Sequence, residues 1–524
     1  MRRYLSSAFV RASLPALLVA LLAGVAAAAA LLVRNGAATT LHEFPLDDAW
    51  IHQVYARGLL RDGLPTYNPG EVETGFSSPL WMLVLAPVQL LAVHLGASLV
   101  LLTKGVGLLF ALAVAVAIAA LVRRLGGSPI AVALAPAFAL LSPTLGFAAL
   151  SGMEVPLAAA LVGIGWLCLD GRSRWRAGFA FALAALARPE ALVVPLTIAA
   201  IELVESPRAR VAEALRRAAA TCAPSLVAVS TWAAFDLWAT GHPLPNTYYV
   251  KHAAGLFDVV EGARYLLGSV VFADPLLAAP AAIAIAVGIA SVRGQAARWR
   301  FGRIVLVTTT TALVAIVATR ALPPRAGYTA QRYFHPFTIY AVPWIVVGLD
   351  RVAMAIRDAA RVRAWLAWVA LGALFALAAA PPLSRARVAY AAHCARIDRL
   401  HTEPARMLAR DTPEGALVGV EAAGAARFHG DRRILDLVGL NAHALAHASS
   451  AEALHCEVVR RHPAYFLVPA EWLSLLGVDF ELRALAAYRS ARWSDRAADR
   501  VVAFASARVR PEAEEACRRL EGSR

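Results

Sequence analysis

Long apolar segments recur along most of this 524-residue chain and leave few ways for it to fold. A segment of about 20 apolar residues is long enough to cross the hydrocarbon core of a bilayer as a helix. About eleven segments qualify, at 12–33, 98–122, 128–149, 155–170, 177–187, 191–204, 218–238, 268–291, 304–322, 335–350 and 364–381. The chain is 59% hydrophobic and 17% charged, which is too apolar for a soluble enzyme. We therefore expect an all-α polytopic membrane protein.

The distribution of positive charge predicts an orientation in the membrane. The net charge is +15, and 49 of the 51 basic residues are arginine, many of them in short loops. In a nucleic-acid-binding protein the basic residues would instead be clustered on a soluble module. If residues 79–95 do not cross, the arginine-rich loops all share the cytoplasmic face with Arg2 and Arg3. We predict that 79–95 is a juxtamembrane or re-entrant helix in a bacterial cytoplasmic membrane, with the N-terminus inside and the C-terminus outside.

The composition changes after about residue 382. Residues 1–381 are expected to form a transmembrane module whose first outer loop, 34–97, carries juxtamembrane helices. In residues 382–524 short apolar strands alternate with helical or turn segments, which predicts a small extracytoplasmic α/β domain. Its expected strands lie at 416–420, 433–437, 464–468 and 501–505. The sequence contains no nucleotide-binding loop, which argues against an ATP-driven pump.

Three cysteines lie in this C-terminal region: Cys394, Cys456 and Cys517. An extracytoplasmic location permits disulfides, so we expect one among the three, with one odd thiol left over. Because Cys394 lies close to the last apolar segment, we favour a bond between Cys456 and Cys517.

Polar motifs with little arginine all fall on the predicted outer face. They lie at 46–50, 74–81, 151–154, 188–190, 245–251 and 331–334. Several such motifs on one face suggest a shared external site. Two short apolar segments, 177–187 and 191–204, are separated by a break at Pro189, as expected for a site set into the membrane.

The pair Asp47 and Asp48 follows the first apolar segment and precedes a segment with helical spacing of apolar residues. One interpretation is a helix N-cap, where aspartate is favoured. The other is a general base that accepts a proton from an acceptor hydroxyl while a leaving group departs. The two interpretations are compatible, because a helix N-terminus can hold a catalytic carboxylate in one orientation.

The ordered set of outer motifs resembles the GT-C-fold glycosyltransferases of bacteria. It is most similar to the branch that contains the mycobacterial terminal arabinofuranosyltransferase of cell-wall arabinan. The matching residues are LDDAWI at 46–51, YNPGE at 67–71, GFSSPLW at 75–81, GME at 152–154, RPE at 188–190, NT at 246–247 with Lys251, and RYF at 332–334. The resemblance covers roughly residues 40–350.

This resemblance implies an inverting enzyme that transfers a sugar from a polyprenyl-phosphate carrier to a glycan, lipid or protein acceptor at the outer face. A first-loop aspartate would act as base or would orient the acceptor. We expect Asp47 to be the base and Asp48 to assist it.

A departing lipid phosphate needs a cation, and three outer residues are candidates: Lys251, Arg188 and Arg332. Lys251 is one of only two lysines in the chain. Its alternative interpretation is a lysine that extends its ammonium group toward the membrane interface. Arg188 could instead pair locally with Glu190, and Arg332 could fix the start of the next helix.

The further substrate-binding candidates are Glu154, Glu190, Asn246, Tyr248, Trp81 and Tyr333. Asp436 and Asn441 follow a predicted strand and could face the acceptor, since ligands of α/β sheets bind beyond the carboxyl ends of strands. They could equally cap the next helix. No residues have metal-ligand spacing, so we predict no cofactor, although the outer carboxylates leave a divalent ion open.

Two other classes of function compete with this interpretation. A transporter or flippase of lipid-linked intermediates would also have many spans, but it predicts charged residues in mid-span, and these are scarce. A non-catalytic membrane scaffold would not need so many outer motifs.

Overall fold

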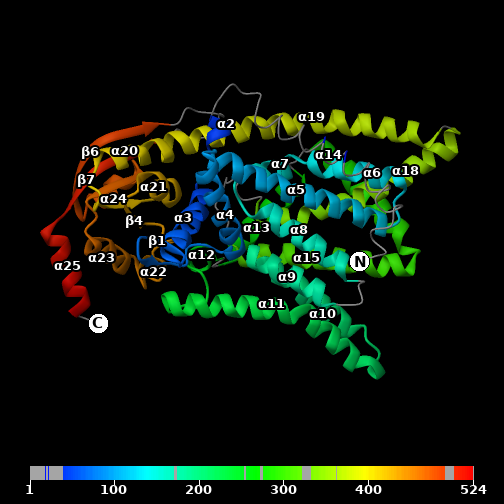
Figure 1. Ribbon diagram of the computed structural model, residues 1–524, viewed down its shortest axis with the longest axis horizontal. Helices are drawn as coiled ribbons and strands as arrows, with labels where there is room; N and C mark the ends of the chain where they lie inside the picture. Colours follow the sequence, from blue (N-terminus) through cyan, green and yellow to red (C-terminus); the bar gives the residue numbers. More distant parts are fainter. Residues whose placement is uncertain are drawn as a thin grey trace. The chain divides into compact units, whose positions relative to one another are not determined.

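The computed structural model describes residues 18, 22, 39–169, 174–252, 255–271, 275–320, 332–361, 363–489 and 501–522. Apart from residues 18 and 22, the expected first span at 12–33 lies outside the described residues. The chain divides into two compact units (Figure 1). The first comprises Met1–Gly36, Lys104–Thr231 and Ala253–Ala389, and the second comprises Ala37–Thr103, Trp232–His252 and Tyr390–Arg524.

The first unit is helical in its described residues. Its elements are α5 (Leu99–Arg124), α6 (Pro129–Leu140), α7 (Pro143–Leu150), α8 (Val155–Cys168), α9 (Trp175–Ala187), η2 (Pro189–Leu192), α10 (Val193–Val204), η3 (Arg208–Arg210), α11 (Val211–Thr240), α13 (Leu256–Val271), α14 (Pro275–Arg293), α15 (Ala296–Thr319), α17 (His335–Thr338), η4 (Ile339–Ala341), α18 (Val342–Ala360) and α19 (Ala364–Ile397). The first residues of α5 and the last residues of α11 and α19 belong to the second unit.

Four helical segments among the described residues are long and apolar enough to cross a membrane: Leu99–Arg124, Arg208–Thr240, Ala296–Thr319 and His335–Ala360. Helices α6 and α7 meet at a bend of 58° and make a fifth if they form one span. Shorter apolar helices, including α8 and α9, accompany them. This is the composition of a multi-pass membrane protein, and the count of about eleven spans stays a prediction.

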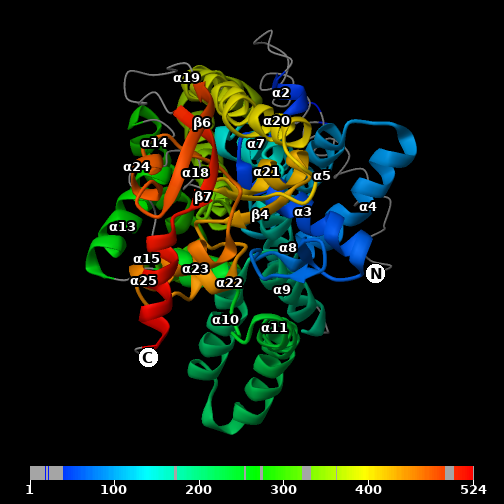
Figure 2. The same ribbon diagram turned by 90° about the vertical axis from the view of Figure 1, so that its left-hand side faces the viewer.

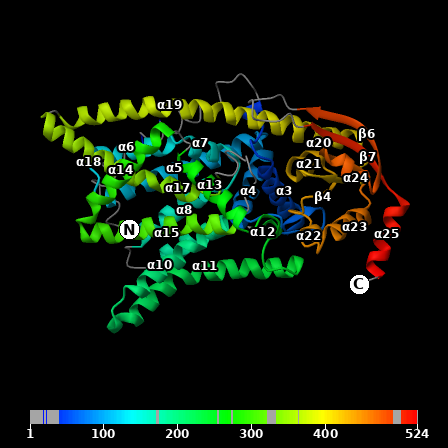
Figure 3. The same cartoon turned by 180° about the vertical axis from the view of Figure 1, so that it is seen from behind.

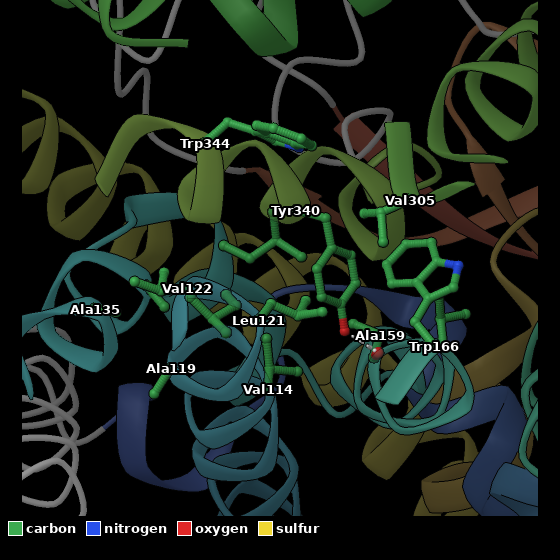
Figure 4. Packing of buried hydrophobic residues seen from close by; sticks show 14 of the residues in the cluster. Val114, Ala119, Leu121, Val122, Ala135, Ala159, Trp166, Val305, Tyr340 and Trp344 are labelled. Carbon is green, nitrogen blue, oxygen red and sulfur yellow. Dashed lines mark hydrogen bonds between the residues drawn. The ribbon is translucent and has the colours of Figure 1, made fainter. Parts of the chain in front are cut away.

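Small residues let the helices of this unit pack closely. Helix α14 lies along α18 (Figure 3), and a Cβ atom added to Gly348 would clash with the carbonyl oxygen of Ala284. In the core between α8 and η4, the Trp166 ring meets the Tyr340 ring edge-on at 4.6 Å (Figure 4). The Tyr340 hydroxyl donates a 2.5 Å hydrogen bond to the carbonyl oxygen of Ala159, which satisfies its buried polar end.

The second unit combines the first outer loop with the C-terminal region. Its loop elements are α2 (Thr39–His42), α3 (Asp47–Asp62), β1 (Thr66–Asn68), β2 (Glu71–Val72) and α4 (Pro79–Leu95), and α12 spans Asn246–Lys251. The C-terminal helices are the π-helix η5 (Asp398–Thr402), α20 (Glu403–Asp411), α21 (Ala423–Gly430), α22 (His443–Ala446), α23 (Ala451–Arg461), α24 (Trp472–Leu476) and α25 (Pro511–Gly522). The predicted helix at 79–95 therefore appears as α4.

A five-stranded mixed sheet organises the C-terminal part of this unit (Figure 2). Its strands are β3 (Leu417–Val420), β4 (Arg433–Asp436), β5 (Tyr465–Pro469), β6 (Phe480–Arg489) and β7 (Val501–Val509), in the order β4-β3-β5-β7-β6. Strand β3 is parallel to β4 and β5, whereas β7 is antiparallel to β5 and β6. All four predicted strands are present, and β6 was not predicted.

A disulfide joins Cys456 of α23 to Cys517 of α25, and Cys394 is a buried thiol outside this bond. The expected pairing is therefore confirmed. The bond ties the C-terminal helix to the helix that precedes β5.

Candidate functional site

The predicted aspartate pair opens helix α3. Asp47 and Asp48 occupy its first turn, where a negative charge interacts favourably with the helix dipole. The N-cap position itself is Leu46, whose extended backbone begins the helix without a capping side chain. The simple N-cap interpretation of Asp47 therefore does not describe this helix, and the two carboxylates serve other contacts.

Both carboxylate oxygens of Asp47 accept hydrogen bonds from the start of α21. The Oδ2 atom accepts from the backbone N–H of Gly424 at 2.7 Å, and Oδ1 accepts from that of Ala425 at 2.9 Å. Burial raises the pKa of the Asp47 carboxyl to about 7, with further increases from the charges of Asp48 and Glu421, although the two backbone donors lower it. Asp47 is thus held in place by the C-terminal region.

A histidine from the π-helix also lies beside Asp47. The Nδ1 atom of His401 is 3.9 Å from Asp47 Oδ1, and His401 is buried. His401 and Glu421 line a cavity of about 10 Å³ beyond the ends of β3 and β5, which is the room of about one water molecule. This cavity is too small for a sugar. A π-helical turn is uncommon and occurs often at functional sites.

Asp48 has different surroundings from its neighbour. Its side chain is 29% exposed, and its Oδ2 atom lies 4.0 Å from the Nζ atom of Lys251, whose side chain is 28% exposed. Lys251 is the last residue of α12, where a positive charge suits the C-terminal end of the helix. The structure therefore brings together one predicted carboxylate and one predicted phosphate-binding cation, both within reach of solvent.

Glu73, which the sequence analysis did not single out, connects three segments of the second unit. Its Oε2 atom accepts a hydrogen bond from Nδ2 of Asn246 at 3.1 Å. Its Oε1 atom lies 3.0 Å from Nδ1 of His443, and this hydrogen bond raises the pKa of that histidine. The backbone N–H of Asn246 donates to the carbonyl oxygen of Thr74 at 3.0 Å. These contacts fix α12, and with it Lys251, against the first outer loop.

The two predicted acceptor-side residues are buried and hydrogen-bonded to each other. Asp436 Oδ2 accepts from both the backbone N–H and Nδ2 of Asn441, at 2.9 and 2.8 Å. The Tyr55 hydroxyl donates to Asn441 Oδ1 at 2.9 Å and accepts from the backbone N–H of Gly75 at 3.0 Å. Burial raises the pKa of Asp436 to about 6. This network joins the loop after β4 to the first outer loop.

The remaining predicted residues of the second unit differ in exposure. The Trp81 ring on α4 is fully buried, so it belongs to the packing of this unit. Tyr248 on α12 is 43% exposed, and its ring meets the neighbouring Tyr249 ring edge-on at 5.5 Å. Tyr248 is thus available to a ligand as the structure stands, and Trp81 is not.

The first unit gathers other predicted residues around three buried ion pairs. Arg188 Nη1 donates to Glu154 Oε1 at 2.6 Å, and Arg188 Nε lies 3.5 Å from Glu190 Oε2. Glu190 Oε1 accepts two hydrogen bonds from Arg320, at 2.7 and 3.1 Å. Burial acts to raise the pKa of Glu190, but the charges of Arg188 and Arg320 outweigh it and lower that pKa to about 2. The charge of Arg188 is therefore largely balanced by glutamates.

Three arginines surround the ring of Tyr333. The guanidinium carbons of Arg188, Arg320 and Arg332 lie 5.1, 5.2 and 5.2 Å from its centroid. Glu154 pairs with Arg188, and Glu190 pairs with Arg320. Guanidinium groups on an aromatic face are attracted by the ring quadrupole. Arg320 was not predicted, because it ends an apolar segment and looks like an ordinary interfacial arginine.

Among the described residues, no group of three or more His, Cys, Asp or Glu side chains is arranged to hold a metal ion. Asp47, Asp48 and Glu73 contact amides, a lysine and a histidine in this structure.

Residues 390–507 match a domain of unknown function, DUF8728. No curated protein matches the chain. Several solved structures are similar to it, among them three from two proteins. ArnT from Cupriavidus metallidurans, in the apo state, has a TM-score of 0.56 at 16% identity, covering 93% of this chain and 97% of that one. The same protein bound to undecaprenyl phosphate has a TM-score of 0.55, with the same identity and coverage.

The third is the oligosaccharyltransferase of Archaeoglobus fulgidus, tethered with an acceptor peptide. Its TM-score is 0.56 at 10% identity, covering 93% of this chain and 76% of that one. Identities this low carry information about the fold alone. The chain has the GT-C fold that these membrane glycosyltransferases share.

Proposed function

We propose that this protein is an integral membrane glycosyltransferase that moves a sugar from a polyprenyl-phosphate carrier to a glycan, lipid or protein acceptor. The GT-C fold supports this, since one structural neighbour binds undecaprenyl phosphate and another is tethered with an acceptor peptide. The reaction takes place at the outer face of the bacterial cytoplasmic membrane, with both the active site and the C-terminal domain outside. The arginine distribution of the loops supports this orientation.

The observation that carries the proposal is the pair of Asp48 and Lys251, with Oδ2 and Nζ 4.0 Å apart. Glycosyl transfer needs a base for the acceptor hydroxyl and a cation for the departing phosphate. Both side chains are partly exposed, so a substrate can reach them. In contrast, the Arg188–Glu154 ion pair is buried, so a substrate cannot reach its side chains in this way.

Each group has a defined task in the transfer. The Asp48 carboxylate accepts the proton of the acceptor hydroxyl, and the oxygen of that hydroxyl attacks the anomeric carbon of the donor sugar. The bond from that carbon to the phosphate oxygen breaks on the opposite face, so the configuration inverts. The sugar therefore lies between the two side chains, and the Asp48 carboxylate and the Lys251 ammonium group separate when the donor binds. The polyprenyl phosphate leaves with the bonding electron pair, and the ammonium group of Lys251 stabilises its added negative charge.

Within the aspartate pair we place the base at Asp48 rather than at Asp47. Both oxygens of Asp47 already accept backbone N–H bonds from Gly424 and Ala425. We assign Asp47 a positioning role, because it fixes the first turn of α3 on which Asp48 lies. The sequence-based assignment of Asp47 as base is the alternative, and variants of the two aspartates distinguish them.

The first unit supplies a second set of candidates for the phosphate. Arg188, Arg320 and Arg332 all adjoin Tyr333. Arg188 is engaged by Glu154 and Glu190, and Arg320 is engaged by Glu190. We propose that Arg332 contacts the phosphate and that Arg188 and the two glutamates hold the surrounding backbone.

The test is to incubate the purified protein in lipid nanodiscs with a panel of polyprenyl-phosphate sugars and candidate acceptors. Turnover of one donor, with release of polyprenyl phosphate and a glycosylated acceptor of inverted configuration, is the expected result. Movement of intact donor across a vesicle membrane without release of polyprenyl phosphate would overturn the proposal in favour of a flippase.

A further inference from the structure

Five side chains of the second unit hold buried hydrogen-bonding atoms without a partner in the described part of the chain. The atoms are Thr74 Oγ1, Trp232 Nε1, both carboxylate oxygens of Asp236, Asn246 Oδ1 and Thr247 Oγ1. Buried polar groups in proteins almost always have a hydrogen-bond partner, because an unmet group loses its hydration without compensation. Several unpartnered polar atoms on neighbouring segments therefore suggest that a ligand supplies their hydrogen bonds.

The atoms come from three segments that contact one another. Asn246 and Thr247 begin α12, and the Asn246 backbone donates to the carbonyl oxygen of Thr74. Trp232 lies on α11 with its ring 5.1 Å from that of Phe76, which follows Thr74 closely in the first outer loop. The loop at Glu73–Phe76 therefore lies against both helical segments.

Asp236 faces the same loop as Trp232. The two residues are one helical turn apart on α11, so their side chains share a face. Burial raises the pKa of the Tyr55 hydroxyl, and the charges of Glu73, Asp436 and Asp236 raise it further. The Tyr55 hydroxyl accepts from the backbone N–H of Gly75 in this loop. Asp236 itself is fully buried.

The chemistry of these atoms indicates what would satisfy them. The oxygen atoms of Asp236 and Asn246 accept hydrogen bonds, and the Trp232 indole N–H donates one. The hydroxyls of Thr74 and Thr247 can donate or accept a hydrogen bond. An indole N–H cannot coordinate a metal ion, and the single negative charge disfavours an anionic ligand. A sugar ring carries several hydroxyls that both donate and accept, and its apolar face packs on aromatic rings.

We propose that Thr74, Trp232, Asp236, Asn246 and Thr247 bind the hydroxyl groups of a sugar ring. This inference rests on the proposed function and names the part of the site that recognises the saccharide. The ring belongs to the lipid-linked donor or to a glycan acceptor, and the chemistry of recognition is the same for both.

The six atoms are closed to solvent, so sugar binding includes an outward movement of α12. This helix has six residues and is held by the hydrogen bond from Asn246 to Glu73 and by the Tyr249 ring, whose centroid lies 4.3 Å from that of His447. Such a short helix can move without disturbing the sheet of this unit.

The test compares ligands that differ only in the sugar. Binding of a polyprenyl-phosphate sugar, of bare polyprenyl phosphate and of a glycan acceptor is measured for the wild type, Asp236→Asn and Trp232→Phe. Asn retains the volume of Asp236 and removes its charge, and Phe retains a ring and removes the N–H. We expect binding of the sugar-bearing donor or of the glycan to weaken about tenfold to a hundredfold, the effect of losing a hydrogen bond to a charged group. Binding of bare polyprenyl phosphate should not change.

Thr240→Val is the matched control, because the Thr240 hydroxyl donates to the backbone carbonyl of Asp236 within the same helix. A loss confined to the donor assigns the site to the donor sugar, and a loss confined to the glycan assigns it to the acceptor. Unchanged binding of both by a folded Asp236→Asn or Trp232→Phe variant overturns the inference. A wild type that binds neither polyprenyl lipid overturns the proposed function and this inference with it.

Discussion

The Nζ atom of Lys251 lies 4.0 Å from Oδ2 of Asp48, although the two residues come from the end of a six-residue helix and from the first outer loop. An exposed ion pair of this length contributes little to stability, typically about 0–1 kcal/mol. Removing either partner should therefore leave the fold intact. The pair is best examined through catalysis.

Asp48→Asn should insert and fold normally but transfer sugar roughly 10²–10⁴-fold more slowly, the usual range for loss of a general base. Turnover of the polyprenyl-phosphate sugar and thermal unfolding are measured on the same preparation. If Asp48→Asn is nearly as active as the wild type while Asp47→Asn is inactive with an unchanged unfolding temperature, the base is Asp47.

Lys251→Met should lower turnover by roughly 10²–10³-fold, the effect of losing one stabilising contact to a developing negative charge. Lys251→Arg keeps the charge and should recover part of the rate. Arg264→Met is a suitable control, since Arg264 is largely exposed and pairs with Glu261 on its own helix. Equal losses in Lys251→Met and Arg264→Met would show a general charge effect instead.

Asp47 predicts a pH dependence of stability. Its pKa is about 7 in the folded protein, against an ordinary value of 3.8, so the folded state binds the proton more tightly. The stabilisation from this proton is complete below pH 3.8 and is lost as the pH rises toward 7. Asp47→Asn resembles the protonated group and cannot titrate.

Unfolding of the wild type and Asp47→Asn is therefore compared between pH 4 and pH 7. The wild type should lose stability relative to the variant as the pH rises across this range. Parallel curves for the two proteins would mean that Asp47 titrates near its ordinary value in the folded state.

Gly348→Ala should destabilise the first unit by about 1–3 kcal/mol, because the added methyl group clashes with the Ala284 carbonyl where α14 meets α18. Gly372→Ala on α19 is the matched control, since nothing lies within 4 Å of an added Cβ there. That change should stabilise its helix by up to about 1 kcal/mol. Thermal unfolding in detergent measures both, and equal effects would refute the close packing of α14 on α18.

The disulfide between Cys456 and Cys517 should form in cells, because the C-terminal domain is expected outside the cytoplasm. Non-reducing mass spectrometry of membranes prepared with a thiol-blocking reagent should detect the linked peptides, with Cys394 still a thiol. Replacing both cysteines by alanine should cost about 2–4 kcal/mol of stability. Blocked thiols at both positions would contradict the outward orientation.

The sequence predicted the features that depend on local pattern. The start of α3 at the aspartate pair, helix α4 and four of the five strands of the sheet follow from apolar spacing. Strand β6 was missed because it is an edge strand: most of its residues are exposed, so its pattern carries little hydrophobic signal.

Long-range contacts could not be predicted in the same way. Glu73 looks like any loop glutamate until Asn246 and His443 are brought to it by distant parts of the chain. Arg188 was a candidate for phosphate binding, and only the fold shows that Glu154 engages it. Spacing along a chain indicates which face of an element a residue occupies, but not which partner another segment supplies.

The backbone N–H groups of Gly424 and Ala425 hold Asp47, although they lie far away in the C-terminal region. Every residue except proline has a backbone N–H group, so substitutions at these two positions need not remove the hydrogen bonds to Asp47. The bonds depend instead on where the helix following β3 begins. The first outer loop and the C-terminal region would therefore have to be inherited together. A chimera that exchanges the C-terminal region between two relatives should retain its active site only if the helix following β3 begins at the same register.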